Sequence, residues 1–425
     1  MHNQLLLLSG DRETSLPFRT GVSLHGHTRH SKESLGFIGE FLARHRPLRS
    51  WIDSQRDYCS CTSGIVLDFD RAWWTPPLCE RQAHHVEARQ IEELGLHPLV
   101  SLSDHDTIDA CLLLRNHPEF RETPISTEWT IHWGAAVFHL GVHNLPSSLA
   151  ASLMTAMGET TASRDEPNTL HLLAELHRIP EVLIVFNHPL WNFMHIGRDR
   201  FSFELTRFLN AAGSFLHAFE LNGMRSHEEN RGVLRLAAAW DQIILSGGDR
   251  HGCEPNASIN LTDASDFSEF VDEVRNGRQS TVLIMPQYNE PLGWRFYRNF
   301  THVIADYPHH PEGRRRWDER TFHPDRNGNV VPMSSLWRVG PPEFLRTIFA
   351  AALLAARIPG RNLPRRWRCR DSQSLLLLNQ KLQSASFPAA AASFPVVSAR
   401  PLVSARPLEV PADDRLYAPA ELAAD

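Results

Sequence analysis

Residues 21–34 read GVSLHGHTRHSKES, an apolar run followed by three histidines, His25, His27 and His30. His25 and His27 flank one glycine. In an extended segment, positions i and i+2 point the same way, so both imidazoles can face one ion. A lone pair of this kind is more often an ordinary feature of a histidine-rich chain than a metal site. Its interpretation therefore depends on which residues stand at the ends of the other apolar runs.

Similar short runs recur along the chain, and polar residues follow most of them. They are PLVSLSDHD (98–106), PISTE (124–128), AVFHLGV (136–142), EVLIVFNHP (181–189), HAFELN (217–222), QIILSGGDRH (242–251) and TVLIM (281–285). Helical periodicity lies between many of them, at 81–94, at 266–276 and after the expected caps Asn168 and Thr169. This alternation indicates an α/β protein built from βα units around a largely parallel sheet. Seven or eight units fit a closed barrel better than an open sheet.

The places where strands and helices alternate, and the places where they do not, divide the chain into three expected segments. A barrel is expected over residues 20–285, interrupted at about 36–80 by an inserted segment that contains CSC, WW and PP. Residues 286–362 are rich in arginine and aromatic residues and are expected to form an appended, ordered segment. Residues 363–425 contain ASFP and VSARPL twice each. Such a composition buries too little apolar surface to offset the entropy of ordering, so this tail is expected to be disordered.

The bulk composition narrows the class of protein. The chain has 425 residues, a formal net charge of −6 and 24 histidines. This charge does not require nucleic acid as a partner, whereas the many imidazoles raise the expectation of metal chemistry. The six cysteines fit no paired zinc framework. No secretory leader or membrane-length apolar run is recognised, which favours a cytoplasmic protein with free thiols and no membrane partner.

The polar residues at the ends of the runs are the candidate ligands. In a parallel barrel all strand carboxyl ends open onto one face, so these residues are expected to converge there. They are His25, His27, His105, Glu128, His139, His188, Asp249 and His251. Imidazole and carboxylate together are the donor set that Zn, Mn and Fe accept. Their joint placement after successive strands therefore favours a metal centre.

These motifs resemble those of a known family. In order, LHGHT, SLSDHDT, the pair Glu128 and His139, FNHP and GGDRH resemble the motifs of the polymerase-and-histidinol-phosphatase (PHP) family of metal-dependent phosphoesterases. The resemblance covers roughly residues 20–285. It implies a distorted (βα)7 TIM-like barrel that binds two or three divalent metals at its carboxyl-terminal mouth and hydrolyses phosphate esters.

The same resemblance implies how the ligands are shared. One metal would be held by His25, His27, Glu128 and Asp249. A second would share Glu128 and add His139 and His188. The third would use His105, His251 and an acidic residue seven places after the first histidine.

The chain departs from the family pattern at that last position, which is Lys32. An ammonium cannot ligate a cation and repels one at close range. Glu33 is the favoured replacement, with His30 as the alternative, or else the third site is weak or absent. Lys32 could instead take over part of the third metal's charge role by pairing with a phosphate oxygen.

The expected chemistry depends on two metal sites. Two ions roughly 3.5–4 Å apart lower the pKa of a shared water from 15.7 toward about 7, which gives a metal-bridged hydroxide. Asp104 is a candidate for orienting an imidazole, and Arg250 for touching substrate, although an extended backbone would turn Arg250 away. Glu220 and Asn222 either shape the pocket or cap a helix.

Four functions remain open. The favoured one is hydrolysis of a phosphate ester of a small molecule or nucleotide. A nuclease is the second, because RFYR (295–298) and RRRW (314–317) could stack bases and hold phosphates. An amidohydrolase is the third, although Glu128 already fills the bridging position that a carboxylated lysine would take. The fourth is a non-catalytic metal-binding scaffold.

Overall fold

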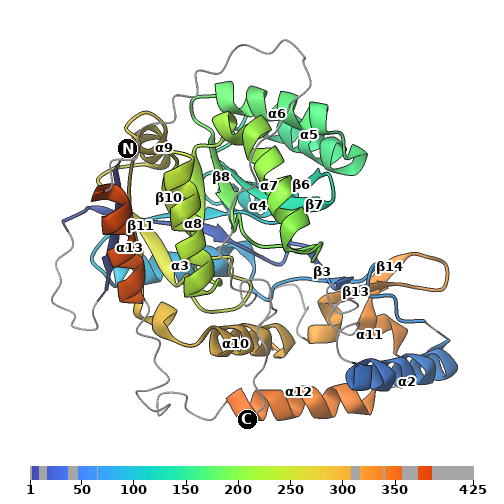
Figure 1. The fold of residues 1–425 in the computed structure, drawn as a ribbon. Helices are drawn as coiled ribbons and strands as arrows, with labels where there is room; N and C mark the ends of the chain where they lie inside the picture. The colour runs from blue at the N-terminus through green and yellow to red at the C-terminus, as the bar shows by residue number, and fades with distance from the viewer. Residues whose placement is uncertain are drawn as a thin grey trace.

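The computed structural model describes residues 2–8, 17–36, 46–64, 66–307, 316–337, 340–356 and 372–384. Its fold is mixed α/β, as expected. Two five-stranded sheets form the centre (Figure 1). The first has the order β1 (His2–Leu7), β12 (Gln279–Ile284), β11 (Ser258–Thr262), β2 (Thr20–Gly26) and β5 (His97–Leu102). The second has the order β10 (Ile243–Gly247), β9 (Ala218–Asn222), β8 (Leu183–Asn187), β7 (Ala136–His143) and β6 (Thr127–Trp133).

The expectation of a largely parallel arrangement is wrong. Within each five-stranded sheet, two of the four strand pairs are parallel and two are antiparallel. The pairs β6–β7 and β7–β8 are antiparallel, so Glu128 lies near the start of its strand, opposite Gly141, and not at a strand end. A short apolar run has the same sequence pattern whether its strand pairs in parallel or antiparallel with its neighbour, so the pattern does not reveal strand direction.

The two sheets meet at two isolated bridges. One joins Gly26 to Arg250, and the other joins His105 to Glu128. Two backbone hydrogen bonds link the sheets at these bridges. Glu128 N donates to Asp104 O at 3.0 Å, and His27 N donates to Arg250 O at 2.9 Å. Neither sheet closes on itself within the described part of the chain. The α/β class is thus confirmed, and closure of a (βα)7 barrel stays a prediction.

The helices largely agree with the periodicity. They are α2 (Arg46–Ser63), α3 (Glu80–Glu92), α4 (Asp109–Arg115), α5 (Ala150–Ser163), α6 (Glu166–Arg178), α7 (Arg198–Ala212), α8 (His227–Ala239), α9 (Phe267–Arg275), α10 (Leu292–Ile304), α11 (Met333–Leu336), α12 (Glu343–Ala356) and α13 (Ser372–Ser384). Short 3-10 turns cover Pro118–Phe120, Gly213–Phe215, Pro286–Asn289 and Trp317–Glu319. The expected cap at Asn168 is wrong, because the Asp165 side chain accepts the hydrogen bond from Asn168 N.

The second sheet packs against α5, α6 and α7 through large apolar side chains (Figure 1). Phe138 and Phe186 lie within ring-stacking range of Phe208 on α7, at centroid distances of 4.9 and 5.3 Å. Trp129, fully buried beside Glu128, donates from Nε1 to Met157 O at 3.1 Å. This packing fixes the strands that carry Glu128 and His139.

A third sheet joins segments that are far apart in the sequence. Its order is β14 (Val330–Pro332), β13 (Thr321–Pro324), β4 (Trp73–Trp74) and β3 (Glu33–Ser34). The segments expected as insertion and appendage therefore pair with each other, and Glu33 is the register partner of Trp74. Figure 1 shows α2, α10, α11 and α12 gathered on this side of the molecule.

Part of the tail expected to be disordered is ordered. Residues 372–384 form α13, which packs against α8 and β1 with Leu375 fully buried. The leucine run 375–378 supplies apolar surface that the Ala/Ser/Pro composition of the whole tail conceals. Residues 363–371 and 385–425 lie outside the described residues. In the ranges that are described, no helix has both the length and the apolar character needed to cross a membrane.

A histidine pair, in which His217 is buried and His177 is half-buried, makes the stability of the fold depend on pH. Ile184 N donates to His217 Nδ1 at 2.9 Å, and His217 Nε2 lies 3.0 Å from His177 Nδ1. Burial, with the charge of Arg275, lowers the pKa of His217 to about 2. The unfolded chain protonates this ring below about 6.5 while the folded protein does not, so stability falls as the pH drops through that value.

We expect His217→Asn to remove that dependence. From pH 7 to pH 5 the wild-type free energy of unfolding should fall by about 2 kcal/mol more than that of the variant. Urea denaturation at both pH values measures the difference. Equal falls in the two proteins would show that His217 is protonated in the folded state.

Candidate metal centre

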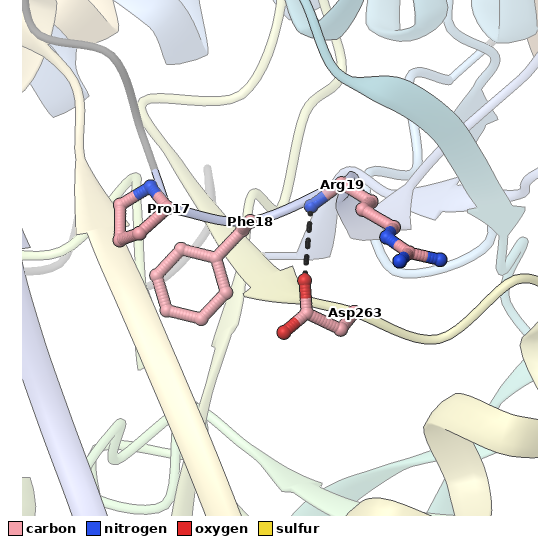
Figure 2. A pocket seen from close by; sticks show the side chains of 4 residues that line it. All are labelled: Pro17, Phe18, Arg19 and Asp263. Carbon is pink, nitrogen blue, oxygen red and sulfur yellow. Dashed lines mark hydrogen bonds between the residues drawn. The ribbon is translucent and has the colours of Figure 1, made fainter.

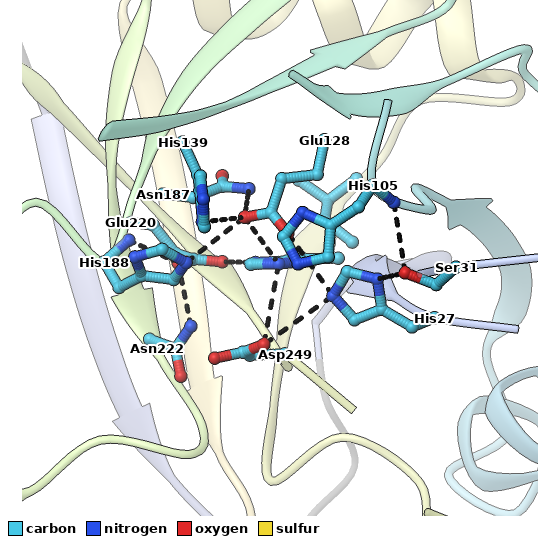
Figure 3. Close-up of polar contacts among 12 residues, drawn as sticks. His27, Ser31, His105, Glu128, His139, Asn187, His188, Glu220, Asn222 and Asp249 are labelled. Carbon is cyan, nitrogen blue, oxygen red and sulfur yellow. Dashed lines mark hydrogen bonds and ion pairs between the residues drawn. The ribbon is translucent and has the colours of Figure 1, made fainter. Parts of the chain in front are cut away.

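The structure brings the predicted ligands together from both central sheets and from β3. Figure 3 shows His27, His105, His139, His188 and Asp249 around Glu128. His25 is on β2, Glu128 on β6 and His139 on β7, while the others lie just after strands or on β3. The full set is His25, His27, Glu33, His105, Glu128, His139, His188, Asp249 and His251. Residues separated by up to 226 positions therefore share one site.

Glu128 is the centre of the cluster, and its side chain is fully buried. Five imidazoles surround its two carboxylate oxygens. Those around Oε1 are His25 Nε2 at 3.0 Å, His188 Nε2 at 3.2 Å and His139 Nδ1 at 3.6 Å. Those around Oε2 are His105 Nε2 at 3.3 Å and His27 Nε2 at 3.4 Å. One carboxylate thus faces nitrogen donors on both of its sides.

Glu33, and not Lys32, faces this cluster. The Glu33 carboxylate lies 3.1 Å from His251 Nε2, 3.5 Å from His105 Nε2 and 3.9 Å from His27 Nδ1. Lys32 is exposed, and its ammonium lies 5.3 Å from the centroid of the Trp73 ring. β3 begins at Glu33, which is buried, whereas Lys32 precedes the strand and its side chain is exposed. Sequence alone left this choice open.

The donor set fits a cation. Three overlapping groups bring their donor atoms within 4.8 Å of one another: His27, Glu33, His105 and His251; His25, His27 and Glu128; and His105, Glu128 and His139. Several of these buried atoms have no hydrogen-bond partner among the described residues: His25 Nε2, His27 Nε2, His139 Nδ1 and Glu128 Oε2. Buried polar atoms are normally satisfied, so this clustering of orphans is what ligands of an ion would show.

Three of the candidate ligands have unusual backbone conformations. His25, His188 and Asp249 have positive φ angles of 61°, 29° and 51°. Such angles cost energy in residues other than glycine and concentrate at functional sites. The prediction from sequence assumed an extended backbone, in which residues i and i+2 point the same way. That assumption is wrong at His25 and Asp249, because their positive φ angles are not those of extended backbone. The ladder between β2 and β5 shifts register between Ser23 and Gly26, next to His25.

The electrostatics of the cluster favour charged carboxylates. Burial opposes ionisation of Glu128, but the nearby imidazoles of His25 and His105 hold its pKa well below the ordinary value. Burial likewise opposes ionisation of Asp249, but the nearby imidazoles of His27 and His25 hold its pKa well below normal. Burial, with the charge of His251, lowers the pKa of His27 to about 4, so this ring is neutral and able to bind a metal at pH 7.

The expected roles of Asp104 and Arg250 need correction. Among the described residues, the Asp104 carboxylate bonds to Thr28 and to no imidazole: it accepts from Thr28 N at 2.5 Å and from Thr28 Oγ1 at 2.6 Å. Arg250 turns away from the cluster and donates from Nε to Glu87 Oε1 at 2.6 Å, with only 3% of its surface exposed. Both side chains therefore bond to residues outside the ligand set, Asp104 to Thr28 and Arg250 to Glu87.

Other residues orient the ligands. Glu220 Oε1 lies 2.5 Å from His25 Nδ1, and its Oε2 accepts from His188 N at 2.7 Å. Asn222 Nδ2 donates to the same Oε2 at 2.9 Å. Contacts of this kind fix the tautomer and direction of a ligating ring. The available signal was the position of Glu220 and Asn222 at a strand end, which also suits a helix cap.

Arg225 and Trp191, which were not singled out from the sequence, pack against each other beside Asp249 and His188. The Arg225 guanidinium lies 3.8 Å from the centroid of the Trp191 ring, and its Nη2 lies 3.3 Å from Asp249 Oδ2. Trp191 in turn lies 4.9 Å from His188, ring centroid to ring centroid. Arg225 therefore holds one oxygen of Asp249, while the other oxygen faces His27 and His251, each at 3.6 Å.

A pocket elsewhere contains none of these residues. It is lined by Pro17, Phe18, Arg19 and Asp263, beside the beginning of β2 and the end of β11 (Figure 2). Arg19 N donates to Asp263 Oδ1 at 3.2 Å. This pocket lies at the opposite end of β2 from His25.

Comparison with known proteins gives little guidance. No family model and no curated protein matches the chain. It is weakly similar to an amidohydrolase from Chromobacterium violaceum determined with bound sulfate and no metal, at 13% identity and a TM-score of 0.31 over 54% of this chain and 87% of that one. It is also weakly similar to a metal-dependent phosphoesterase, so described, from Bifidobacterium adolescentis, at 17% identity and a TM-score of 0.29 over 47% and 91%.

Proposed function

We propose that this protein is a metal-dependent hydrolase of phosphate esters. The observation that carries the proposal is the buried Glu128 carboxylate, with five imidazole nitrogens within 3.6 Å of its two oxygens. A carboxylate placed in this way can serve two ions at once, as a bridging ligand does in two-metal hydrolases. The PHP-like motifs of the sequence lead to the same assignment.

The ligands divide into three groups around this centre. His25, His27, Glu128 and Asp249 would hold one ion, and Glu128, His139 and His188 would hold a second. His105, His251 and Glu33 would hold a third, with Glu33 in place of the acidic residue that the family pattern has at position 32. When bound, divalent ions such as Mn, Zn or Fe would supply a water of lowered pKa and withdraw charge from phosphoryl oxygens.

The charge balance favours an anionic substrate. Glu33, Glu128 and Asp249 are the three carboxylates among the candidate ligands. Two or three divalent ions bring four or six positive charges, so the loaded site keeps a positive surplus that a phosphate ester neutralises and a neutral amide does not. Arg225, beside Asp249, adds to the same field.

The nuclease alternative loses its best support. Arg295 of the RFYR stretch is only 4% exposed and donates to the backbone carbonyls of Gly223 and Arg225. Arg298 pairs with Glu254 and Glu290. Both arginines are thus engaged within the protein. Of RRRW, residues 314 and 315 lie outside the described residues. We therefore propose a small-molecule or nucleotide phosphate ester as the substrate.

The organisation of the chain fits the same proposal. Residues 20–285 would form the catalytic barrel, closed where the Gly26–Arg250 and His105–Glu128 bridges join the two sheets. Residues 286–356 would brace its mouth through the third sheet and through Arg295. A cytoplasmic location remains the prediction from composition.

The activity is tested with protein stripped by a chelator and reloaded with Mn²⁺ or Zn²⁺. We expect p-nitrophenyl phosphate to be hydrolysed only after reloading, and faster than bis(p-nitrophenyl) phosphate or p-nitroacetanilide. Faster cleavage of the diester would favour the nuclease, and cleavage of the anilide would favour the amidohydrolase. A protein that binds metal yet cleaves none of the three would be a scaffold.

A further inference from the structure

Ser31 is a fully buried residue whose hydroxyl contacts three of the candidate ligands. Its Oγ donates to Glu33 Oε1 at 2.6 Å, accepts from His105 N at 3.2 Å and lies 3.3 Å from His27 Nδ1. Figure 3 shows its contacts with His27 and His105. The three ligands come from separate segments, one just after β2, one on β3 and one just after β5. One small side chain therefore connects three parts of the site.

These contacts use every hydrogen-bonding position of the Ser31 hydroxyl. A serine hydroxyl has one hydrogen to donate and two lone pairs that accept. Glu33, whose carboxylate faces His251 and His105 at 3.1 and 3.5 Å, is ionised in such a setting and can only accept, so it takes the hydrogen. The backbone N of His105 can only donate, so it takes one lone pair. His27 Nδ1 is left to donate to the other.

A hydrogen on Nδ1 leaves the second nitrogen of His27 free. A neutral imidazole has one hydrogen, so Nε2 then carries a lone pair. This nitrogen lies 3.4 Å from Glu128 Oε2 and 3.6 Å from Asp249 Oδ1, and it has no hydrogen-bond partner among the described residues. A lone pair that faces two carboxylate oxygens is repelled unless a cation lies among them. Nε2 is therefore the metal-binding atom of His27.

The same hydrogen decides which ion His27 serves. His27 belongs to two of the overlapping donor groups, one with His25 and Glu128 and the other with Glu33. Its Nδ1 lies 3.9 Å from Glu33 Oε1, but that nitrogen carries the hydrogen and cannot bind a metal. The free Nε2 faces Glu128 and Asp249 instead. His27 thus serves the ion of Glu128, and the ion of Glu33 keeps the other ligands of its group.

A short turn holds Ser31 in this position. Ser31 N donates to Thr28 O at 2.9 Å, and His30 N donates to Thr28 Oγ1 at 3.2 Å. Thr28 in turn donates to the buried Asp104 carboxylate from both its backbone N and its hydroxyl. Asp104 thereby supports the site indirectly, because it fixes the turn that carries the Ser31 hydroxyl.

We propose that Ser31 is a positioning residue, which holds the Glu33 carboxylate and directs His27 Nε2 toward the ion shared with Glu128. The proposal rests on the proposed function only in assigning ions to these ligands. Its new content is the role of a hydroxyl that is not itself a ligand, and the placement of the hydrogen on His27 Nδ1. Because Glu33 stands one place after the acidic position of the family pattern, its bond to Ser31 also fixes the displaced carboxylate.

The test compares two substitutions of Ser31. Ser31→Ala removes the hydroxyl, whereas Ser31→Thr keeps it. Ser101→Ala is the matched control, because Ser101 is 1% exposed and its Oγ lies 2.8 Å from Nδ1 of His143, an imidazole outside the ligand set. Mn²⁺ affinity is measured by calorimetry, and the visible spectrum of the Co²⁺-loaded protein reports the ligand geometry.

We expect Ser31→Ala to weaken Mn²⁺ binding by about 10-fold or more and to change the Co²⁺ spectrum, as loss of an outer partner of a ligand does. Ser31→Thr should stay within about 3-fold of wild type because it keeps that partner, and Ser101→Ala should match wild type. Wild-type affinity in Ser31→Ala, or an equal loss in Ser101→Ala, would overturn the positioning role.

A second measurement observes the hydrogen on His27 itself, in the unsubstituted protein. Protein labelled with ¹⁵N-histidine should show a hydrogen on His27 Nδ1, both free of metal and loaded with Zn²⁺. The His27 signals are identified by their absence from His27→Gln. An Nδ1 without hydrogen would refute the role of Ser31. If Nδ1 carries the hydrogen but the protein binds no metal, the proposed function fails and the contact with Ser31 stands.

Discussion

Replacing Glu128 with glutamine is expected to lower kcat/KM for p-nitrophenyl phosphate by at least about 1,000-fold, equivalent to roughly 4 kcal/mol in the barrier. Glutamine keeps the size of the side chain but removes the charge that two ions would share. It also places an NH₂ group where one carboxylate oxygen faces imidazole nitrogens at 3.0–3.6 Å. Steady-state kinetics and calorimetric Mn²⁺ titration measure the effect.

Glu204→Gln is the matched control for this change. Glu204 is another buried glutamate, 5% exposed, whose carboxylate lies 3.0 Å from Arg207 on the same helix, α7. Its loss should lower stability and leave Mn²⁺ affinity and kcat unchanged. If Glu128→Gln were to bind Mn²⁺ and turn over like wild type, Glu128 could not be the bridging ligand.

Replacing Glu33 with glutamine is expected to remove one metal ion per chain and to lower kcat/KM by at least about 10-fold. Glu33 is the carboxylate of the group that includes His27, His105 and His251, and His251 Nε2 is 3.1 Å from it. Without that charge, His105 and His251 hold an ion less tightly. The other two groups keep all of their ligands, so two ions should remain.

Lys32→Gln separates the two explanations of the departure from the family pattern. Lys32 is exposed against Trp73, so its loss should change neither the number of metals nor kcat. The contrast between adjacent residues is measured by elemental analysis of both variants, prepared side by side. An unchanged metal count in Glu33→Gln, or a lost ion in Lys32→Gln, would reverse the assignment.

The sequence predicted the membership of the site better than its architecture. His25, His105, His188 and Asp249 could be found because polar residues stand at the ends of apolar runs, and that position alone brings them to one rim. The structure confirms that they converge. Glu128 and His139 also converge, but by a different route, since they lie on an antiparallel pair of strands.

The orientation of individual side chains could not be predicted in the same way. Arg250 does turn away from the cluster, as alternation along an extended backbone would place it, but its partner Glu87 lies 163 positions away in the sequence. Asp104 pairs with Thr28, a contact between segments 76 positions apart. Local pattern carries no information on such long-range partners, and the same holds for α13, which is ordered by packing on α8 and β1.

The number of metal ions bound per chain tests the central claim most directly. Purified protein equilibrated with Mn²⁺ or Zn²⁺, freed of unbound ions and measured by elemental analysis should contain two or three equivalents per chain. Glu128→Gln treated in the same way should contain fewer. Wild-type protein that retains less than one equivalent under every loading condition would contradict the account.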